Sequence, residues 1–140
     1  MILINQVDCF KYICDEISGY IIIMKKAYYL SSCSTCDRIL KEVKDHHFQL
    51  QDIKFDAITE EQIDQMYQFT HSYEALFSKR ARKYKSMGLK DQNLKEEDFK
   101  NLILEEYTFL KRPVFIVGHE VFVGNSKKTI DGLLKCLVNE

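Results

Sequence analysis

The sequence predicts an α/β domain in which helices flank a mixed four-stranded sheet. An apolar stretch at residues 26–30 has strand character and leads into Cys33-Ser34-Thr35-Cys36. From Cys36 onward, apolar residues recur at the spacing of one helix face, namely Ile39, Leu40 and Val43. Near the end of the chain, residues 114–117 and 121–123 are two apolar runs joined by a short glycine-containing turn, which predicts a β-hairpin.

The first half of the chain is predicted to form a β-α-β unit. Residues 26–30 form its first strand, residues 35–44 its helix, and residues 48–53 its second strand. Because a helix joins them, the two strands are expected to run parallel. Thr59 is followed three residues later by Gln62, a capping-box pattern that opens a second helix. The buried stripe of that helix is predicted to be Ile63, Met66, Tyr67 and Thr70.

A helical block is predicted to precede the C-terminal hairpin. Residues 73–77 and 80–87 are short helical pieces, and Gly88 ends the second. Asn93 is predicted to cap a further helix, whose apolar face is Phe99, Leu102 and Ile103. Ser126 starts the last helix, with apolar residues at helical spacing at Ile130, Leu133, Leu134 and Leu137. This order predicts a thioredoxin-like fold with a helical insertion before its C-terminal β-β-α unit.

Length and composition are those of one ordinary globular domain. The chain has 140 residues, of which 46% are hydrophobic and 29% charged. Its formal net charge of -1 gives no field that would draw the whole chain to nucleic acid or to a membrane. Five cysteines are an odd number with no regular framework of spacings, which disfavours a secreted disulfide scaffold. We therefore expect a cytoplasmic protein.

Residues 1–23 differ from the rest and are predicted to be an N-terminal extension. They are rich in apolar residues, but acidic and basic residues interrupt them, and the longest apolar run is residues 20–24. Such a run is far shorter than the roughly 20 residues of a membrane span, and the segment lacks the pattern of a signal peptide. Met24 stands directly before the first predicted strand. Residues 1–23 are therefore either a real N-terminal extension or the product of a start set too early, with Met24 as the true start. The second interpretation is favoured, and the domain is expected at residues 24–140.

The two cysteines between the first strand and the first helix predict a reactive thiol. Cys33 and Cys36 stand at the first turn of the helix, where backbone N–H groups lack partners and the helix dipole is positive. This setting lowers a cysteine pKa from about 8.5 toward neutrality, and the thiolate is the reactive form. An inert pair of core thiols would be the alternative. The order of strand, Cys-x-x-Cys and helix favours a thioredoxin-like redox site.

Three stretches of the chain carry more specific motifs. The first is residues 28–36, which contain both cysteines. The second joins Leu-Phe-Ser-Lys-Arg at residues 76–80 to Tyr-Lys-Ser-Met-Gly-Leu at residues 84–89. The third is Phe-Leu-Lys-Arg-Pro-Val at residues 109–114, with Val-Gly after it at residues 123–124. Together they resemble the arsenate reductase and Spx family over nearly the whole chain after the N-terminal extension.

The resemblance implies roles for individual residues. It implies that Cys33 is the nucleophile and that Arg112 grips an oxyanion beside it. Pro113, the only proline, matches a proline whose peptide bond is cis and which faces the catalytic cysteine. Glutaredoxin-dependent arsenate reductases carry a second arginine where this chain has Ser78, and Arg80 can supply that charge from two residues on. An arginine offers planar paired donors that suit arsenate or phosphate.

Two functions remain open at this point. In the first, Cys33 attacks arsenate, and either Cys36 or an external thiol donor, such as glutathione with glutaredoxin or thioredoxin, resolves the adduct. In the second, a Cys33–Cys36 disulfide acts as an Spx-like redox switch that alters binding to RNA polymerase. The second cysteine and Ser78-Lys79-Arg80 match the Spx pattern, while Tyr29 and Gly124 replace a histidine and an arginine of the reductases. We expect the reductase, with no metal or resident cofactor.

The remaining candidates have simpler interpretations. Residues 79–85 contain five basic side chains, for which a solvated helix face is favoured over an anion- or nucleic-acid-binding patch. His46 and His47 fit a surface turn, and a zinc site would need ligands beyond one Cys-x-x-Cys. Cys136 lies in the last predicted helix and is expected to be a buried structural thiol.

Overall fold

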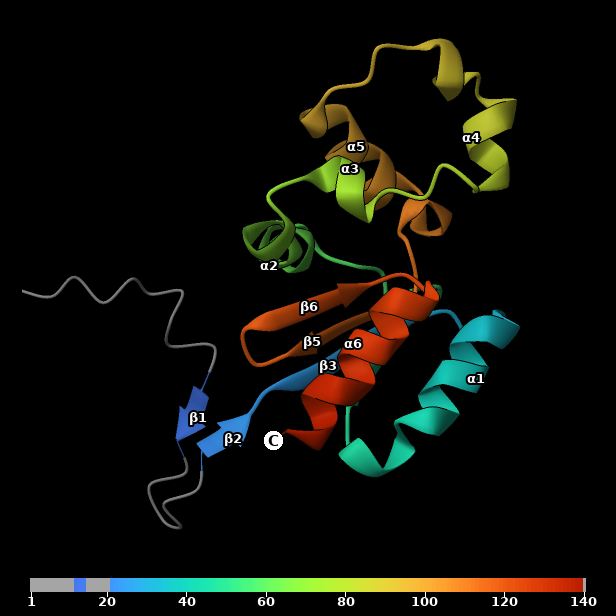
Figure 1. Ribbon diagram of the computed structural model, residues 1–140. Coiled ribbons are helices and arrows are strands. Elements are labelled where there is room, and N and C mark those ends of the chain that lie inside the picture. The colour runs from blue at the N-terminus through green and yellow to red at the C-terminus, as the bar shows by residue number, and fades with distance from the viewer. Residues whose placement is uncertain (1–11, 15–20, 140) are drawn as a thin grey trace, which may run out of the picture.

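A mixed four-stranded sheet forms the centre of the protein (Figure 1). The computed structural model describes residues 12–14 and 21–139. The strand order is β4-β3-β5-β6, in which β3 and β4 are parallel and the other neighbours are antiparallel. These strands are β3 (Lys25–Tyr29), β4 (Gln49–Asp52), β5 (Val114–Val117) and β6 (Glu120–Val123). The predicted thioredoxin-like sheet is confirmed, with strand boundaries that differ by at most one residue.

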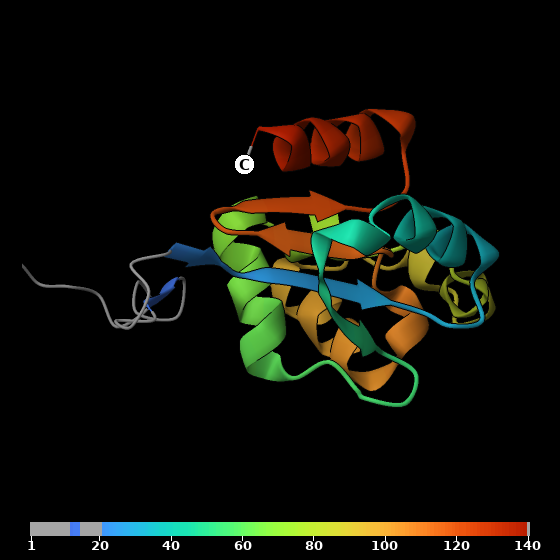
Figure 2. The ribbon, with the colours of Figure 1, turned by 90° about the horizontal axis from the view of Figure 1, so that it is seen from below.

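Helices cover both faces of this sheet. Figure 1 shows α1 and α6 on one face, and the helical block of α3, α4 and α5 rising beyond the sheet. Figure 2 gives the same arrangement from below, with the strands between α6 on one side and α2 and α5 on the other. The helices are α1 (Ser34–Glu42), α2 (Glu60–Thr70), α3 (Tyr73–Leu76), α4 (Arg82–Ser86), α5 (Glu96–Glu105) and α6 (Lys127–Val138).

Two apolar cores form because side chains alternate along the strands. On β3, Ala27 faces one side of the sheet and Tyr28 the other. The Ala27 side is closed by α1 and α6, which contribute Ile39, Val43, Ile130, Leu133 and Leu137. The Tyr28 side is closed by α2, α3 and α5, which contribute Ile63, Met66, Leu76, Phe99 and Ile103. The helical insertion therefore belongs to the same core as one sheet face.

The helix starts agree with the predictions in two cases and differ in one. The Thr59 side chain accepts a hydrogen bond from the Gln62 N–H, so the predicted capping box is present. Ser126 caps α6 as predicted. Asn93 does not cap α5, because that helix begins at Glu96 and the Asp98 carboxylate accepts the Lys95 backbone N–H at 2.8 Å. The acidic side chain three residues inside the helix therefore satisfies the start that Asn93 was predicted to cap.

The N-terminal segment contributes a small second sheet. Strands β1 (Tyr12–Cys14) and β2 (Ile21–Ile23) pair antiparallel, and β2 lies directly before β3. Residues 1–11 and 15–20, which include Cys9, lie outside the described residues, and the prediction of an extension at residues 1–23 stays a prediction. Among the helices of the described chain, none is long and apolar enough to cross a bilayer.

Two segments far apart in the sequence run side by side between the sheet and the helical block. Phe77 forms an isolated antiparallel bridge with Leu110. On either side of it, the Ser78 N–H donates to the Phe109 carbonyl at 2.6 Å, and the Lys111 N–H donates to the Leu76 carbonyl at 2.8 Å. These bonds fix the start of the basic segment against the segment that leads into β5.

Phe77 also forms the centre of an aromatic cluster. Its ring lies 4.9 Å from that of Phe109, 5.0 Å from that of Phe99 and 5.8 Å from that of Tyr84, measured between centroids. Only 1% of Phe77 is exposed. One side chain thus packs together the bridge, α4 and α5.

We predict that Phe77→Ala lowers the free energy of unfolding by about 3–5 kcal/mol, because it removes buried aromatic surface and leaves a cavity. Urea denaturation followed by circular dichroism measures this change. Phe55→Ala is the matched control, since 79% of Phe55 is exposed and its loss is expected to cost no more than about 0.5 kcal/mol. Equal effects of the two substitutions would contradict the packing role of Phe77.

Candidate functional site

Cys33 stands at the junction of β3 and α1. The chain leaves β3 at Tyr29, turns so that the Cys33 N–H donates to the Leu30 carbonyl at 3.0 Å, and enters α1 at Ser34. Cys33 is therefore the N-cap residue, and its carbonyl accepts the Asp37 N–H. Its side chain is partly exposed. A thiol in this position faces the unpartnered N–H groups of the first helical turn.

The surroundings of Cys33 favour its thiolate. Partial burial acts to raise the pKa of the Cys33 thiol, but it is outweighed by hydrogen bonds from the backbone N–H and thiol of Cys36 and from the backbone N–H of Thr35. The positive charge of Arg112 adds to them. The net result is a pKa below the ordinary thiol value, which makes Cys33 the nucleophilic member of the pair.

Cys36 is the opposite case. It is fully buried, and burial, together with the hydrogen bond to Cys33 and the negative charge there, raises its pKa to about 11. Cys36 therefore stays a protonated thiol near neutral pH. As a protonated group next to Cys33, it is a hydrogen-bond donor to the Cys33 thiolate.

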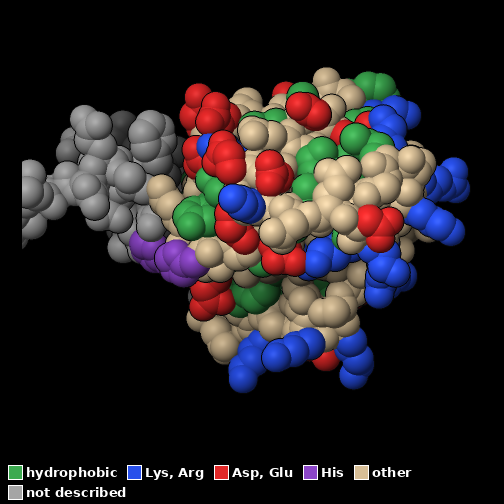
Figure 3. Space-filling view, turned by 90° about the horizontal axis from the view of Figure 1, so that it is seen from above, with side chains coloured by type: hydrophobic (Ala, Val, Ile, Leu, Met, Phe, Trp, Pro, Cys, Tyr) green, Lys and Arg blue, Asp and Glu red, His purple; other side chains and the backbone are tan. Residues whose placement is uncertain are grey.

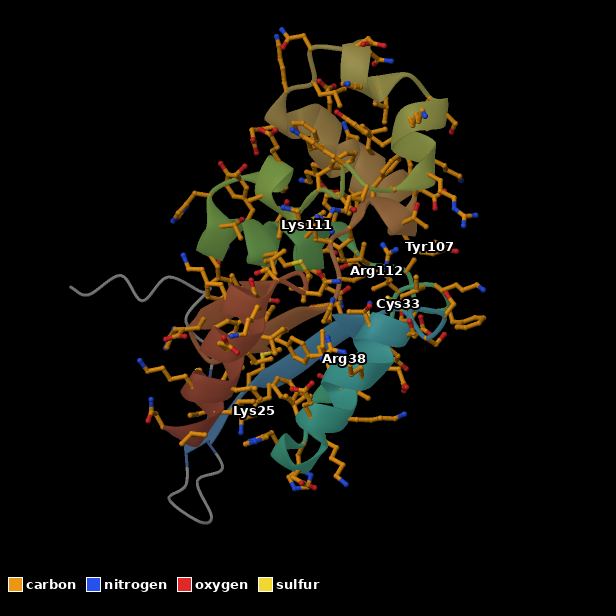
Figure 4. All side chains as sticks on the ribbon, turned by 45° about the vertical axis from the view of Figure 1, so that its right-hand side comes forward. Lys25, Cys33, Arg38, Tyr107, Lys111 and Arg112 are labelled. Atoms are coloured by element: carbon orange, nitrogen blue, oxygen red, sulfur yellow. The ribbon has the colours of Figure 1, made fainter. Side chains whose placement is uncertain are left out.

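Arg112 is held in place by the segment that precedes β5. Its Nη1 donates to the carbonyls of Thr108 at 3.1 Å and Leu110 at 3.2 Å. Its Nε is buried and has no hydrogen-bond partner among the described residues. The Arg112–Pro113 peptide bond is cis, as the resemblance implied. Figure 4 shows Arg112 beside Cys33, with Lys111 on the side of the helical block.

Cys33, Ser78, Arg80 and Arg112 line one open pocket of about 930 Å³. Ser78 and Arg80 come from the segment after α3, which the bridge at Phe77 fixes beside the Arg112 segment. The structure therefore brings together four of the six residues predicted for the site. The other two are buried, Cys36 at the start of α1 and Pro113 at the entrance to β5, and neither lines the pocket.

The pocket also contains residues to which the sequence analysis assigned no role in the site. Two are cations, Lys79 and Lys111, and one is a carboxylate, Glu74 on α3. The start of α6 supplies the far wall through Asn125, Ser126 and Thr129. Only the bridge between two distant segments places the lysines here. In the sequence, the only indication that these lysines lie at the site is that each directly precedes a predicted site arginine, Arg80 or Arg112.

Gly124 also lines the pocket, at the position where the reductases carry an arginine. Its φ of +85° lies in a region that residues with side chains rarely adopt. Its N–H donates to the Pro113 carbonyl at 2.9 Å, so the turn is tied to the strand that follows Arg112. The local backbone therefore favours glycine here, even though no atom lies within 4 Å of the position that a Cβ would occupy.

The remaining candidates lie outside the pocket. Figure 3 shows acidic side chains gathered on one side of the helical block and basic ones on the other. In the basic run, Lys83 pairs with Glu106 while Arg82 and Lys85 are exposed, so a solvated face describes this part of it. His47 adopts the left-handed turn that ends a short 3-10 helix. Within residues 12–14 and 21–139, no group of three potential ligands gathers to hold a metal ion.

Comparison with known proteins agrees with this geometry. The model of the ArsC family matches residues 28–133, from β3 into α6. The chain belongs to the ArsC family. No curated protein matches the sequence.

Solved structures show the ArsC-family fold in bacterial relatives. A candidate arsenate reductase of Yersinia pestis aligns with a TM-score of 0.67 and 14% identity, covering 79% of this chain and 98% of its own. One from Streptococcus mutans aligns with a TM-score of 0.65 and 23% identity, covering 79% and 97%. The arsenate reductase of Vibrio cholerae aligns with a TM-score of 0.63 and 17% identity, covering 80% and 96%. At these identities the likeness is one of fold.

We predict that iodoacetamide at neutral pH modifies Cys33 before Cys36 or Cys136. The pKa of Cys33 is lowered and its side chain is partly exposed, whereas the pKa of Cys36 is raised to about 11 and its side chain is buried. The rate should rise as pH passes upward through the pKa of Cys33 and then level off, because only the thiolate reacts. Peptide mapping by mass spectrometry identifies the modified residue. First modification at Cys136 would contradict the site assignment.

Proposed function

We propose that the protein is a thiol-dependent oxidoreductase of the arsenate reductase type. Its substrate is a small oxyanion, with arsenate as the first candidate. The observation that carries the proposal is the meeting of Cys33, whose pKa is lowered, with Arg112 in one cationic pocket. A nucleophilic sulfur and a guanidinium at the same place are what attack on an oxyanion requires.

In the first step, the Cys33 thiolate attacks arsenic(V). A sulfur–arsenic bond forms, and one oxygen of arsenate leaves as water after it has been protonated. Arg112 stabilises the negative oxygens during this step, since its guanidinium is fixed by two carbonyls and needs no reorganisation. Arg80 and Lys111 line the same pocket and add positive charge around the anion.

In the second step, a second thiol attacks the Cys33 sulfur. A disulfide forms, the sulfur–arsenic bond breaks, and its electron pair stays with arsenic, which leaves as arsenite. The two thiols supply the two electrons of the reduction. Cys36 is the internal candidate for this thiol because it hydrogen-bonds to Cys33. Two external thiols, or one dithiol, then reduce the Cys33–Cys36 disulfide through a mixed disulfide, become a disulfide themselves and restore both cysteines.

The size of the pocket supports a role for an external thiol as well. A volume of about 930 Å³ is at the upper end of ordinary small-molecule sites and much larger than one tetrahedral oxyanion. A thiol donor such as glutathione, or the active-site loop of glutaredoxin or thioredoxin, can therefore approach Cys33 along this opening. The thiol donor needs no second opening to reach Cys33, because Cys33 itself lines this pocket.

A redox-switch regulator is the second candidate function. It is favoured by two residues that line the pocket, Ser78 and Gly124, which stand where the reductases carry arginines. A regulator needs the Cys33–Cys36 pair but not tight oxyanion binding. In that case oxidation would change how the protein binds a partner such as RNA polymerase.

We predict that Cys33→Ser abolishes arsenate-dependent thiol oxidation, because no nucleophile remains. Cys36→Ser should instead accumulate a mixed disulfide between Cys33 and the external thiol, visible as an added mass in intact-protein mass spectrometry. Cys136→Ser is the matched control and should retain activity. If arsenate reduction by the wild type does not exceed the Cys33→Ser background with either donor system, the regulator is the better assignment, and binding to RNA polymerase in each redox state becomes the test.

We predict that Arg112→Lys lowers kcat/KM for arsenate by about 10²-fold, since lysine keeps the charge but loses the planar set of donors. The measurement is steady-state arsenate reduction coupled to NADPH oxidation. Arg38→Lys is the control, because Arg38 is an exposed arginine of α1 that pairs with Glu42. A loss of similar size in both variants would contradict a specific role for Arg112.

A further inference from the structure

The pocket holds one carboxylate among its cationic side chains. Glu74 lies on α3, and the cations around the pocket are Lys79, Arg80, Lys111 and Arg112. A site built only to concentrate highly charged anions would gain nothing from this carboxylate, because its negative charge repels theirs. We therefore ask how Glu74 affects which ligands the pocket binds.

Glu74 is directed at one particular cation. Its Oε1 lies 2.5 Å from Lys79 Nζ, and this contact raises the pKa of Lys79. The Lys79 ammonium also lies 6.0 Å from the centroid of the Phe99 ring. Both contacts orient Lys79 toward the helical block. Lys79 therefore lines the pocket while the Glu74 carboxylate compensates its charge.

The Glu74–Lys79 ion pair is expected to contribute little to the stability of the fold. About half of each side chain is exposed, at 49% for Glu74 and 52% for Lys79. Exposed ion pairs of this kind contribute little to stability. The Glu74→Gln substitution should therefore leave the fold intact. Its main effect is expected on ligand binding.

We propose that Glu74 is a specificity-determining residue that limits the charge of the anion bound beside Cys33. By compensating Lys79 and adding its own negative charge, it disfavours dianions relative to monoanions of the same shape. The inference rests on the oxyanion-binding function proposed above. Its physical basis is that a second negative charge on a ligand doubles both the repulsion from Glu74 and the attraction that a free Lys79 would supply.

Sulfate and perchlorate are suitable probes of this selectivity. Both are tetrahedral and unreactive toward thiols, and they carry two and one negative charges. Their binding is measured as protection of Cys33 from iodoacetamide in the full-length protein at constant ionic strength. In Glu74→Gln, sulfate should bind about threefold or more tightly than in the wild type, while perchlorate should gain less. The ratio of the two affinities is the result that decides.

Glu42→Gln is the matched control. Glu42 is also an exposed carboxylate in an ion pair, with Arg38 on α1, but it does not line the pocket. It changes the net charge by the same amount and should leave the ratio unchanged. An unchanged sulfate-to-perchlorate ratio in Glu74→Gln overturns the proposal, and so does an equal change in Glu42→Gln. In the second case, the overall charge of the protein would explain the change in the ratio.

The test separates this inference from the proposed function. Protection by sulfate requires only an anion site beside Cys33 and no turnover. If arsenate is not reduced but the ratio changes in Glu74→Gln alone, Glu74 sets charge selectivity in a pocket with another reaction. If Arg112→Lys leaves sulfate protection intact, the oxyanion site itself is wrongly placed, whatever Glu74 does.

Discussion

The stabilised thiolate of Cys33 is the interaction on which the rest of the site depends. It arises because a strand ends one turn before a helix begins, so that the N-cap position is a cysteine facing free N–H groups. Arg112 adds a positive charge from a segment almost eighty residues later. Each contribution is modest, and burial opposes them. Their sum decides which of the two cysteines ionises first as the pH rises.

The helical insertion matters to the site because of where it returns to the sheet. The bridge between Phe77 and Leu110 joins the end of α3 to the segment before β5. That pairing brings Ser78 and Arg80 into the same pocket as Lys111 and Arg112. The aromatic packing of Phe77 ties the bridge to α5. The packing of the helical block thereby helps to fix the segments that line the pocket.

Local sequence patterns predicted the strands, most helix starts and the place of Cys33 at the start of α1, because these features depend on neighbours within one or two turns. The capping box at Thr59 and the cap at Ser126 are examples. The prediction for Asn93 was wrong because α5 begins at Glu96, with Lys95 as its N-cap residue, and the Asp98 carboxylate accepts the Lys95 N–H. Lys111 and Glu74 could not be predicted as pocket residues, since only tertiary pairing brings their segments to Cys33.

The two cysteines also differ in a way that orders the steps of thiol chemistry. Burial raises the pKa of Cys36, and the hydrogen bond and negative charge of Cys33 raise it further. Once Cys33 is bonded to a substrate or a thiol, its negative charge is gone, and the contributions from Cys33 disappear. The charge of Arg112, which lowers the pKa of Cys36, is then no longer offset by the thiolate. In the proposed reaction, Cys36 thus becomes easier to ionise only after Cys33 has reacted, so the second thiol gains reactivity only once there is an adduct for it to release.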